Sequence, residues 1–398
     1  MFANDRCSRS LRTRRTDEDL LAAMRATIPT TMPAVVTMGH GGLEQLVYHH
    51  DWPVPRPGRG EVLIAVHACG MNNTDINTRV GWYSKRVSSG TTAEGGARGF
   101  AGAADSDAAW GGTAIRFPRI QGADICGRVV DLGDDAPGEL LGKRVLVDPW
   151  LRDPADPFDL DAAAYLGSER DGGYAHYTTA PATNIHPIDS PLSDVELATF
   201  PTSYVTAENM LRRAAVGSGD VVLVTGASGG VGTALLQLVR RRGATPVGVA
   251  GAEKAKAVRA AGASAVIPRD TSDLAAALQA ATGSATVDVV ADVVGGASFM
   301  TVLSALRRGG RYTCAGAIAG PIVELDLRTF YLNDLTLTGA TMTPLEAFGE
   351  LVEIVEHGEL RPLVAAVYPL ERLQEAQVAF LEKRHVGNIV IEVGAPAT

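Results

Sequence analysis

The sharpest chemical signal in the sequence is a glycine-rich turn between an apolar run and a helical pattern. The apolar run covers residues 221–224, and glycines follow it at positions 226, 229 and 232. Glycines at this spacing permit a tight turn and let backbone N–H groups approach a pyrophosphate, and the helix start adds roughly half a positive charge. The pattern therefore predicts a dinucleotide site, with a ligand-free glycine turn as the alternative. The residues expected to contact the cofactor here are Gly226, Ser228, Gly229, Gly230, Val231 and Gly232.

The residues after the second expected strand indicate which dinucleotide is bound. NAD sites usually carry Asp or Glu at this point, about 20 residues past the glycines, to hold the ribose 2′-OH. This chain has Gly-Val-Ala-Gly-Ala at 248–252, followed by Lys254, and Arg269 comes just past the third strand. Two cations without an acid at the strand tip suit a 2′-phosphate, which predicts NADP(H). Glu253 keeps NAD(H) open, because it could hold a ribose if the loop bends inward.

Alternating strands and helices supply the framework for this turn. Ser193 can cap a first helix, and a second helical stretch runs from about 205 to 215. Strands are then expected at 221–224, 245–249, 265–267, 287–290, 312–315 and 335–337, with helices at 231–241, 253–261, 272–281 (capped by Ser272) and 299–307. Short apolar strands separated by helices predict an α/β fold with a doubly wound parallel sheet, a Rossmann domain that we place at 195–342.

The remainder of the chain has a different pattern. Short apolar runs at 62–66, 127–132, 144–147 and 175–179, separated by Gly and Pro, predict an irregular, partly open β-barrel without long helices over 33–194. Within it, the Gly-, Ala- and Ser-rich stretch 84–112 is expected to be a long surface loop, either a flexible flap or an inert insertion. In the segment 343–398, helices at 345–357 and 370–382 precede a strand at 388–393 that we expect to return to the first domain.

Composition excludes several classes of partner. The net charge of -9 leaves no basic footprint for nucleic acid, and no apolar run reaches the roughly 18 residues that would span a membrane. The four cysteines form no C-x-x-C pair, which excludes a thiolate zinc cluster and a disulfide framework and favours a reducing cytoplasm. Residues 1–32 lack the apolar stretch of a secretory signal, so we expect a disordered extension, or an over-called start with Met24 or Met32 as the true one.

Taken together, these motifs resemble the medium-chain dehydrogenase/reductase superfamily, and in particular its zinc-free quinone oxidoreductase and enoyl reductase branch. The resemblance covers almost everything from Pro33 to Val393 and rests on several segments besides the glycine turn: 34–42, 57–62, 70–75, 292–296 and 387–390. It implies a GroES-like β-barrel catalytic domain beside the Rossmann domain, an active site between them, hydride transfer from a nicotinamide to a small-molecule substrate, and a homodimer or homotetramer. We also expect Val293, Gly316 and Ala317 to contact the cofactor.

The same resemblance argues against a catalytic zinc. Zinc members of the superfamily bind the metal through a Cys in the segment that matches 70–75 and through a Gly-His-Glu motif. Here Asn72 stands at the Cys position, and Gly122-Ala123-Asp124 stands at the Gly-His-Glu position. Ala123 has no ligand atom and Asn72 is a poor zinc ligand, so the chemistry is expected to proceed without a metal Lewis acid.

The resemblance also implies the catalytic residues. Zinc-free members keep an Asn-x-x-Asp arrangement, matched by Asn72 and Asp75, a following Tyr, matched by Tyr83, and a Thr-Ala step near the nicotinamide, matched by Thr206. We expect Asn72 to stabilise a developing oxyanion and Asp75 to orient its neighbours. Tyr83, Tyr174 or water would supply the proton. A structural turn is the alternative for Asn72 and Asp75.

The reaction that these residues predict is NADPH-dependent conjugate reduction of a quinone, an enone or an enoyl thioester. Three alternatives stay open at this stage: a redox-neutral cyclase or isomerase, a cofactor-binding protein without catalysis, and a zinc-free carbonyl or alcohol oxidoreductase. The fold by itself does not decide among them.

Overall fold

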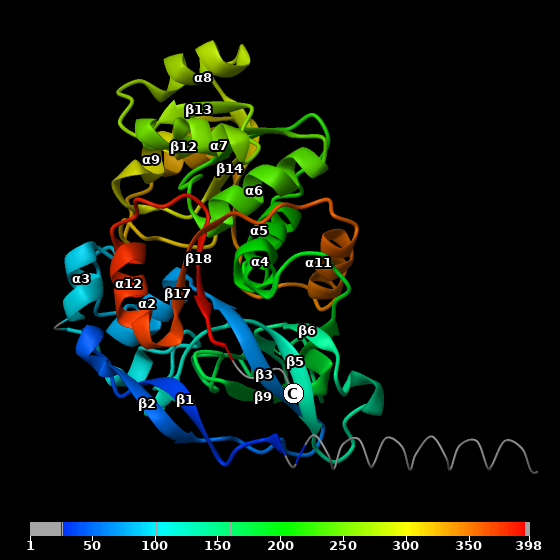
Figure 1. Ribbon diagram of the computed structural model, residues 1–398. Helices are drawn as coiled ribbons and strands as arrows, with labels where there is room; N and C mark the ends of the chain where they lie inside the picture. The colour runs from blue at the N-terminus through cyan, green and yellow to red at the C-terminus, as the bar shows by residue number, and fades with distance from the viewer. Residues whose placement is uncertain (1–24, 26, 101, 160, 395–398) are drawn as a thin grey trace, which may run out of the picture.

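Two domains make up the protein, and the C-terminal segment runs between them (Figure 1). The computed structural model describes residues 25, 27–100, 102–159 and 161–394. Most of the extension expected at 1–32 lies outside the described residues. Its last two residues, Thr31 and Met32, belong to strand β1 (Thr31–Thr37), and Met32 is buried, so the disorder expected for these two residues was wrong.

The second domain contains a six-stranded sheet in which every pair of neighbouring strands is parallel. Its spatial order is β13-β12-β11-β14-β15-β16, which is the 3-2-1-4-5-6 order of a Rossmann fold. The strands are β11 (Val221–Val224), β12 (Thr245–Ala250), β13 (Ala265–Pro268), β14 (Val287–Asp292), β15 (Leu306–Cys314) and β16 (Thr336–Gly339). The predicted doubly wound fold class is confirmed.

Helices cover both faces of this sheet, as the apolar strands require. On β11, Val222 and Val224 pack with α5 (Pro201–Arg213) and α6 (Gly230–Arg241), whereas Leu223 packs on the opposite side with α8 (Leu274–Thr282) and α9 (Phe299–Ser304). Successive residues of a strand point to opposite faces, so a fully apolar strand needs a layer on each side. The neighbouring helix α7 (Ala255–Ala260) lies on the α6 side.

The first domain is built on a seven-stranded sheet that the C-terminal segment completes. Along the main path the order is β10-β6-β5-β3-β18-β17, and β9 also pairs with β3. The last strand, β18 (Asn388–Glu392), pairs antiparallel with β3 (Glu61–Gly70), so the chain returns to the first domain. The remaining strands of this sheet are β5 (Asp124–Leu132), β6 (Arg144–Val147), β9 (Tyr177–Pro181), β10 (Ile185–Pro187) and β17 (Val364–Pro369). The residue boundaries proposed for the domains stay predictions.

Two smaller sheets complete the β-structure of this domain. One is β2-β1-β4, with β2 (Leu46–Pro53) and β4 (Arg119–Ile120) on either side of β1, and the other joins β7 (Trp150–Leu151) to β8 (Ala164–Tyr165). Between the two domains, α4 (Asp194–Leu197) begins at Ser193, whose hydroxyl accepts a hydrogen bond from the Glu196 N–H. The cap expected at Ser193 is therefore present.

Several local expectations were wrong, each for an identifiable reason. The first domain contains a helix that was not expected, α2 (Asn73–Val80), and its polar residues give no apolar stripe in the sequence. Strand β17 was missed as well. Helix α9 ends at Ser304 rather than at 307, because Leu306 already pairs with Val287 in the sheet. Helix α8 is capped by Asp273, not by Ser272.

The insertion 84–112 packs far more than a loose surface loop would. It contains a short helix, α3 (Ala93–Arg98), that lies against α2 and α12 (Leu373–Leu381) (Figure 1). The buried guanidinium of Arg79 donates a hydrogen bond to the Gly96 carbonyl at 2.6 Å. Ala108 and Ala109 are fully buried. Small residues that looked unable to pack instead allow close approach to neighbouring backbone.

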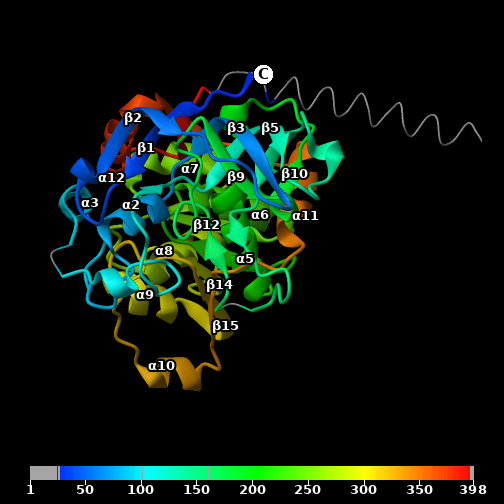
Figure 2. The same ribbon diagram turned by 90° about the horizontal axis from the view of Figure 1, so that it is seen from below.

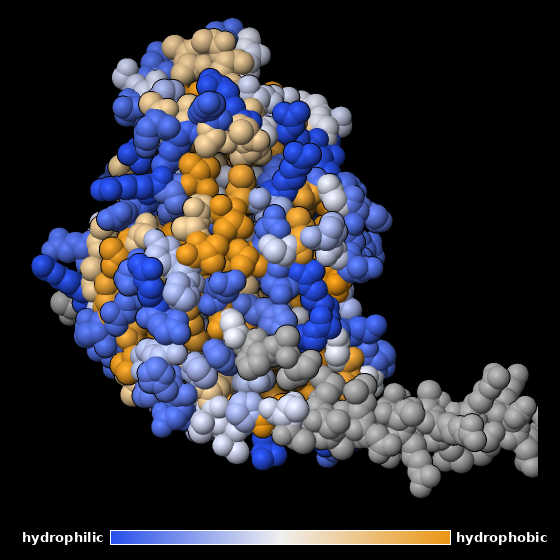
Figure 3. Space-filling model, viewed as in Figure 1, coloured by the Kyte–Doolittle hydropathy of each residue, from blue (hydrophilic) through white to orange (hydrophobic). Residues whose placement is uncertain are grey.

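Hydrophilic residues cover much of the face seen in Figure 3, and apolar side chains gather near its middle, level with the junction of the domains. Figure 2 shows helix α10 (Leu327–Leu332) projecting from the second domain. None of the helices in the described part of the chain is both long and apolar enough to span a membrane.

Candidate active site

A cavity of about 710 Å³ lies between the two domains and receives residues from both. That size falls within the range of small-molecule and cofactor sites. The second domain contributes the carboxyl ends of β11, β12, β13, β14 and β15, and the first contributes the start of α2 together with β7 and β8. Ligands of doubly wound sheets bind at this edge, where the strand order reverses.

The glycine-rich turn has the geometry that close approach of a ligand requires. Gly226 has φ +56°, a backbone conformation that favours glycine. A β-carbon on Gly232 would lie 2.2 Å from the Gly226 carbonyl oxygen, so only glycine lets α6 pack against the turn. At Gly229 the nearest atom would be 3.6 Å away, which leaves open space beside the start of α6. No side chain caps that helix, so its N–H groups stay available to an anion.

The structure brings every sequence-predicted cofactor residue to this one cavity. The lining includes Thr206, Gly226, Ser228, Gly229, Gly230, Val231, Gly232, Lys254, Arg269, Val293, Gly316 and Ala317. Two buried polar atoms on the lining, Nδ1 of His385 and Nδ2 of Asn388, have no hydrogen-bond partner among the residues that the structure describes. A buried polar group without a partner is unfavourable, so a polar ligand fits this lining.

The cavity is electropositive at the tips of β12 and β13. Lys254 and Arg269 line it together with Lys383, which the sequence analysis missed, and no Asp or Glu occurs among the described lining residues. The Lys254 ammonium lies 3.5 Å from the Ser228 hydroxyl and also donates to the Lys383 carbonyl. Burial, together with the nearby Lys254, lowers the pKa of Lys383 to about 7. A bound anion would favour the charged form of this lysine.

Glu253, which kept NAD(H) open, is exposed and does not line the cavity. An acid that holds a ribose hydroxyl must face the nucleotide. The charged side chains that line the cavity here belong to Lys254, Arg269 and Lys383.

Of the four residues expected to be catalytic, two line the cavity. Asn72 is one of them, and its side-chain amide donates to Asp124 at 2.8 Å. The other is Tyr83, whose hydroxyl donates to Thr74 at 3.1 Å. An amide has two N–H groups, so Asn72 retains a donor beyond the one that Asp124 engages.

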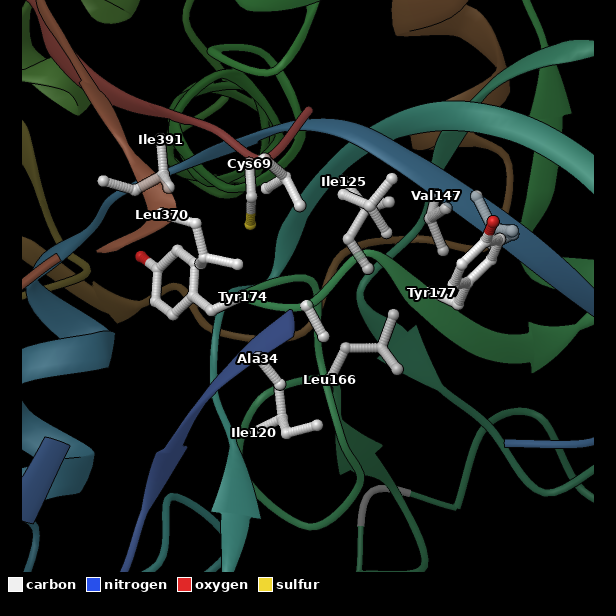
Figure 4. Close-up of a cluster of buried hydrophobic side chains, with 14 of the residues drawn as sticks. Ala34, Cys69, Ile120, Ile125, Val147, Leu166, Tyr174, Tyr177, Leu370 and Ile391 are labelled. Carbon is white, nitrogen blue, oxygen red and sulfur yellow. The ribbon is translucent and has the colours of Figure 1, made fainter. Parts of the chain in front are cut away.

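Asp75 and Tyr174 do not line the cavity. The Asp75 carboxylate accepts from the Asn72 backbone N–H at 2.7 Å and completes a capping box at the start of α2, as in the structural alternative for this pair, and its orienting role stays a prediction. Burial raises its pKa to about 6. Tyr174 is fully buried in the core of the first domain, beside Leu370 and Cys69 (Figure 4). It is therefore not placed to donate a proton to a ligand in the cavity, and we do not retain that role for it.

Aromatic side chains line the part of the cavity that the first domain forms. Trp150 and Tyr165 lie with ring centroids 4.8 Å apart, and Trp110 from the insertion packs edge-on against Trp150 at 4.5 Å. Trp82 and Tyr83 complete the lining. Such walls bind flat, apolar groups through their large area and their preferred edge-to-face geometry.

A buried carboxylate connects several of these polar groups. Asp124 is 1% exposed and accepts hydrogen bonds from the Asn72 amide and from both the backbone N–H and the hydroxyl of Thr202. Burial raises the pKa of Asp124 to about 7. In the sequence, Asp124 stands out only because it takes the place of the Glu in the Gly-His-Glu motif of zinc members.

The described residues contain no group of three or more His, Cys, Asp or Glu side chains that could hold a metal ion. Ala123 and Asn72 stand at the two positions considered for zinc, and Ala123 is buried. Cys69 and Cys126 are buried thiols, whose pKa values burial raises well above the usual range. Thiols of this kind are not activated as thiolate ligands.

Comparison with known proteins decides the family. Residues 58–190 match the model of the alcohol dehydrogenase GroES-like domain, and residues 230–357 match that of the zinc-binding dehydrogenases. A solved structure from Sinorhizobium meliloti 1021, described as a "putative alcohol dehydrogenase", is 46% identical, with a TM-score of 0.83 over 94% of this chain and 99% of its own. The chain belongs to the medium-chain dehydrogenase/reductase superfamily. It is therefore an oxidoreductase that binds a nicotinamide cofactor.

Other members of the superfamily are more distant. Quinone oxidoreductase of Homo sapiens is 28% identical over 88% of this chain and 94% of its own. The 2-octenoyl-CoA carboxylase reductase CinF, solved with NADP and 2-octenoyl-CoA, is 26% identical, with a TM-score of 0.77 over 94% of this chain and 90% of its own.

The residues expected to contact the cofactor all line the cavity, whereas most of its aromatic lining was not foreseen. The cofactor residues follow one another closely around a single turn, which gives a local signal. Trp110, Trp150, Tyr165 and Thr202 are scattered along the chain, and only the fold brings them together. The Lys383 side chain comes from the loop before β18 and carries no motif of its own.

Proposed function

We propose that this superfamily member is an NADPH-dependent, zinc-independent reductase that transfers hydride to an activated C=C bond of a quinone, an enone or an enoyl thioester. The observation that carries the proposal is the composition of the cavity lining. One half presents cations without a carboxylate, and the other presents aromatic walls around the free amide donor of Asn72.

The cofactor choice rests on Lys254 and Arg269. A 2′-phosphate adds negative charge next to the adenine ribose, and these two cations at the tips of β12 and β13 match that charge. Lys383 also lines the cavity, with its ammonium donating to the Asn73 side chain at 2.9 Å. The NADP complex of the 26%-identical carboxylase reductase supports this choice. Zinc independence rests on the absence of a ligand group among the described residues and on Ala123 at the family's histidine position.

The chain's own residues provide the other requirements of conjugate reduction. When bound, the nicotinamide supplies a hydride, and its acceptance at the β-carbon moves negative charge to the substrate oxygen. Asn72 can donate an N–H to that oxygen without being charged itself, and its orientation is fixed by Asp124 and by Ser203 at 3.3 Å. The walls around Trp110 and Trp150 exclude water and hold a flat conjugated group.

The test is loss of NADPH absorbance with the purified protein, in the presence of a chelator, and with a small panel of quinones, enones and enoyl thioesters. We expect turnover with at least one member of the panel and no loss of rate on chelation. Activity that the chelator abolishes and zinc restores would contradict zinc independence. No turnover across the panel would contradict the proposed reaction.

A second candidate is a carbonyl or alcohol oxidoreductase that works without zinc. The naming of the 46%-identical structure as an alcohol dehydrogenase favours it. Oxidation of simple alcohols with NADP⁺, in the absence of any enone reduction, would distinguish this activity from the first.

A further inference from the structure

A chain of hydrogen bonds runs from the aromatic wall of the cavity into the buried interior. The Tyr165 hydroxyl and the Thr202 hydroxyl lie 2.8 Å apart, and Thr202 donates to one carboxylate oxygen of Asp124. Tyr165 and Thr202 line the cavity, whereas Asp124 lies behind them. The second Asp124 oxygen accepts from the Asn72 amide at 2.8 Å, so the two cavity-facing ends are held by one carboxyl group.

Hydride transfer leaves the substrate one proton short, and this chain of hydrogen bonds can supply that proton. A substrate that accepts hydride carries an extra negative charge and must take up one proton, whether a C=C or a C=O bond is reduced. Among the tyrosines on the lining, Tyr83 bonds to the Thr74 hydroxyl and to the Asn77 side chain, neither of which is an acid. Tyr165 is the one connected to a buried acid.

We propose that Tyr165 donates the proton in the reduction and that Thr202 and Asp124 return a proton to it, an inference that rests on the proposed function. The O–H bond of Tyr165 breaks as a new O–H bond forms on the substrate's negatively charged oxygen. When a C=C bond is reduced this gives an enol, which tautomerises to the saturated carbonyl compound by moving that proton to the α-carbon. Thr202 then passes its proton to the phenolate and takes one from the carboxyl group of Asp124, which is left as a carboxylate. One proton from solvent restores Asp124 before the next cycle, so each turnover consumes one hydride and one proton.

The surroundings of Asp124 favour this role. Burial raises its pKa to about 7, so a proton is available near neutrality. The titratable groups that influence it or are influenced by it are Asp75 on α2, Cys69 on β3, Tyr165 and Tyr174. None of these is a cation, and Asp75 raises the pKa of Asp124 further. Burial also raises the pKa of Tyr165 well above its usual range, so its phenol keeps the proton until a stronger base appears.

Stopped-flow and steady-state kinetics with NADPH and the best enone of the panel test the donor. Tyr165→Phe keeps the ring but removes the proton, and we expect kcat to fall by about 10²-fold or more while NADPH affinity is unchanged. Thr202→Val should leave the first turnover near normal, because Tyr165 starts protonated, and should slow the following turnovers. Thr202→Ser should restore the rate of these later turnovers. The matched control is Tyr48→Phe, a half-buried tyrosine of β2 outside the cavity, which should change neither rate.

The pH dependence has a defined sign. The relay needs protonated Asp124, so kcat should fall as pH rises through about 7, and Asp124→Asn should remove that fall. The solvent isotope effect on kcat should be larger in Thr202→Val than in the wild-type protein. Unchanged kcat and an unchanged solvent isotope effect in Tyr165→Phe would overturn the proposal.

Infrared spectroscopy of the substrate-free protein separates a failed relay from a failed reaction assignment. We expect a protonated-carboxyl band that disappears as pH rises through about 7, is absent in Asp124→Asn and shifts in Thr202→Val. If the wild-type protein turns over no member of the panel, the assigned reaction fails. The infrared band still tests whether Asp124 carries a proton. If no band is lost in Asp124→Asn, Asp124 carries no proton and the relay is wrong.

Discussion

At the scale of single residues, the cofactor pocket is defined by charge rather than by shape alone. Lys254 and Arg269 lie at the tips of β12 and β13. Lys383 also lines the cavity, donates to Asn73 at 2.9 Å, and is sufficiently buried that its pKa is lowered to about 7. Holding such a group without an anion is electrostatically unfavourable, because burial penalises the charged form. A phosphate at this point would relieve that penalty.

This leads to a prediction for Arg269→Ala and Lys254→Ala. Each substitution removes a charged hydrogen-bond donor, which is worth about 1.5–3 kcal/mol. We expect the Kd of NADPH to rise about 10- to 100-fold in fluorescence titrations, with little change in the Kd of NADH. Arg259→Ala, an exposed arginine of α7, is the matched control. Equal losses for both cofactors would show that these residues do not recognise the 2′-phosphate.

At the scale of elements, the insertion 84–112 joins the two domains instead of lying free. The Thr91 N–H donates to the Ile318 carbonyl in the loop after β15, and the Thr91 hydroxyl donates to Asn77 on α2. A β-carbon on Gly90 would lie 2.5 Å from the Ile318 carbonyl oxygen, so the contact needs glycine. The same insertion carries Trp110 to the aromatic wall, so under the proposed function it would contact the substrate.

Substitution of Trp110 tests this role. Trp110→Ala removes a half-buried ring from the wall, which should cost about 1.5–3 kcal/mol of apolar contact with a large substrate. We expect KM for 1,4-naphthoquinone to rise by 10-fold or more, and KM for the smaller p-benzoquinone to change little. Trp110→Phe should restore most of the difference. Equal effects on both quinones would show that Trp110 does not contact the substrate.

At the scale of the whole molecule, one surface is unusually apolar. The segment that projects from the second domain in Figure 2 carries exposed Ile322, Leu327, Tyr331 and Leu332, each more than half exposed. Next to it along the chain, β16 lies at the edge of the parallel sheet, and within the described part of the chain it pairs with β15 alone. Exposed apolar patches and open strand edges are typical of interfaces. We therefore propose that this face forms a homodimer.

Light scattering during size-exclusion chromatography measures this directly. The molar mass measured for the wild-type protein should be twice the 41.6 kDa of one chain. The double variant Leu327→Glu/Tyr331→Arg should have the mass of a monomer. Phe158→Ser, which changes an exposed phenylalanine of the first domain, should leave the dimer intact. A monomeric wild type would contradict the interface.

The sequence by itself determined the second domain and its cofactor turn. The reason is locality: each strand, helix and glycine from Val221 to Gly232 is specified by neighbours in the chain, and the apolar strands permit only a layered sheet. The polar helix α2 of the first domain was hard to foresee, because no apolar stripe in its sequence marks it.

Only the tertiary structure decided which polar groups face the cavity. Tyr174 and Tyr165 are both buried tyrosines in short extended segments, and nothing in the sequence separates them. Tyr174 packs into a hydrophobic core, whereas Tyr165 reaches Thr202 and, through it, Asp124, over separations of 37 and 78 residues. Contacts between segments so far apart depend on how the sheets and the insertion pack, and that packing is a property of the folded chain as a whole.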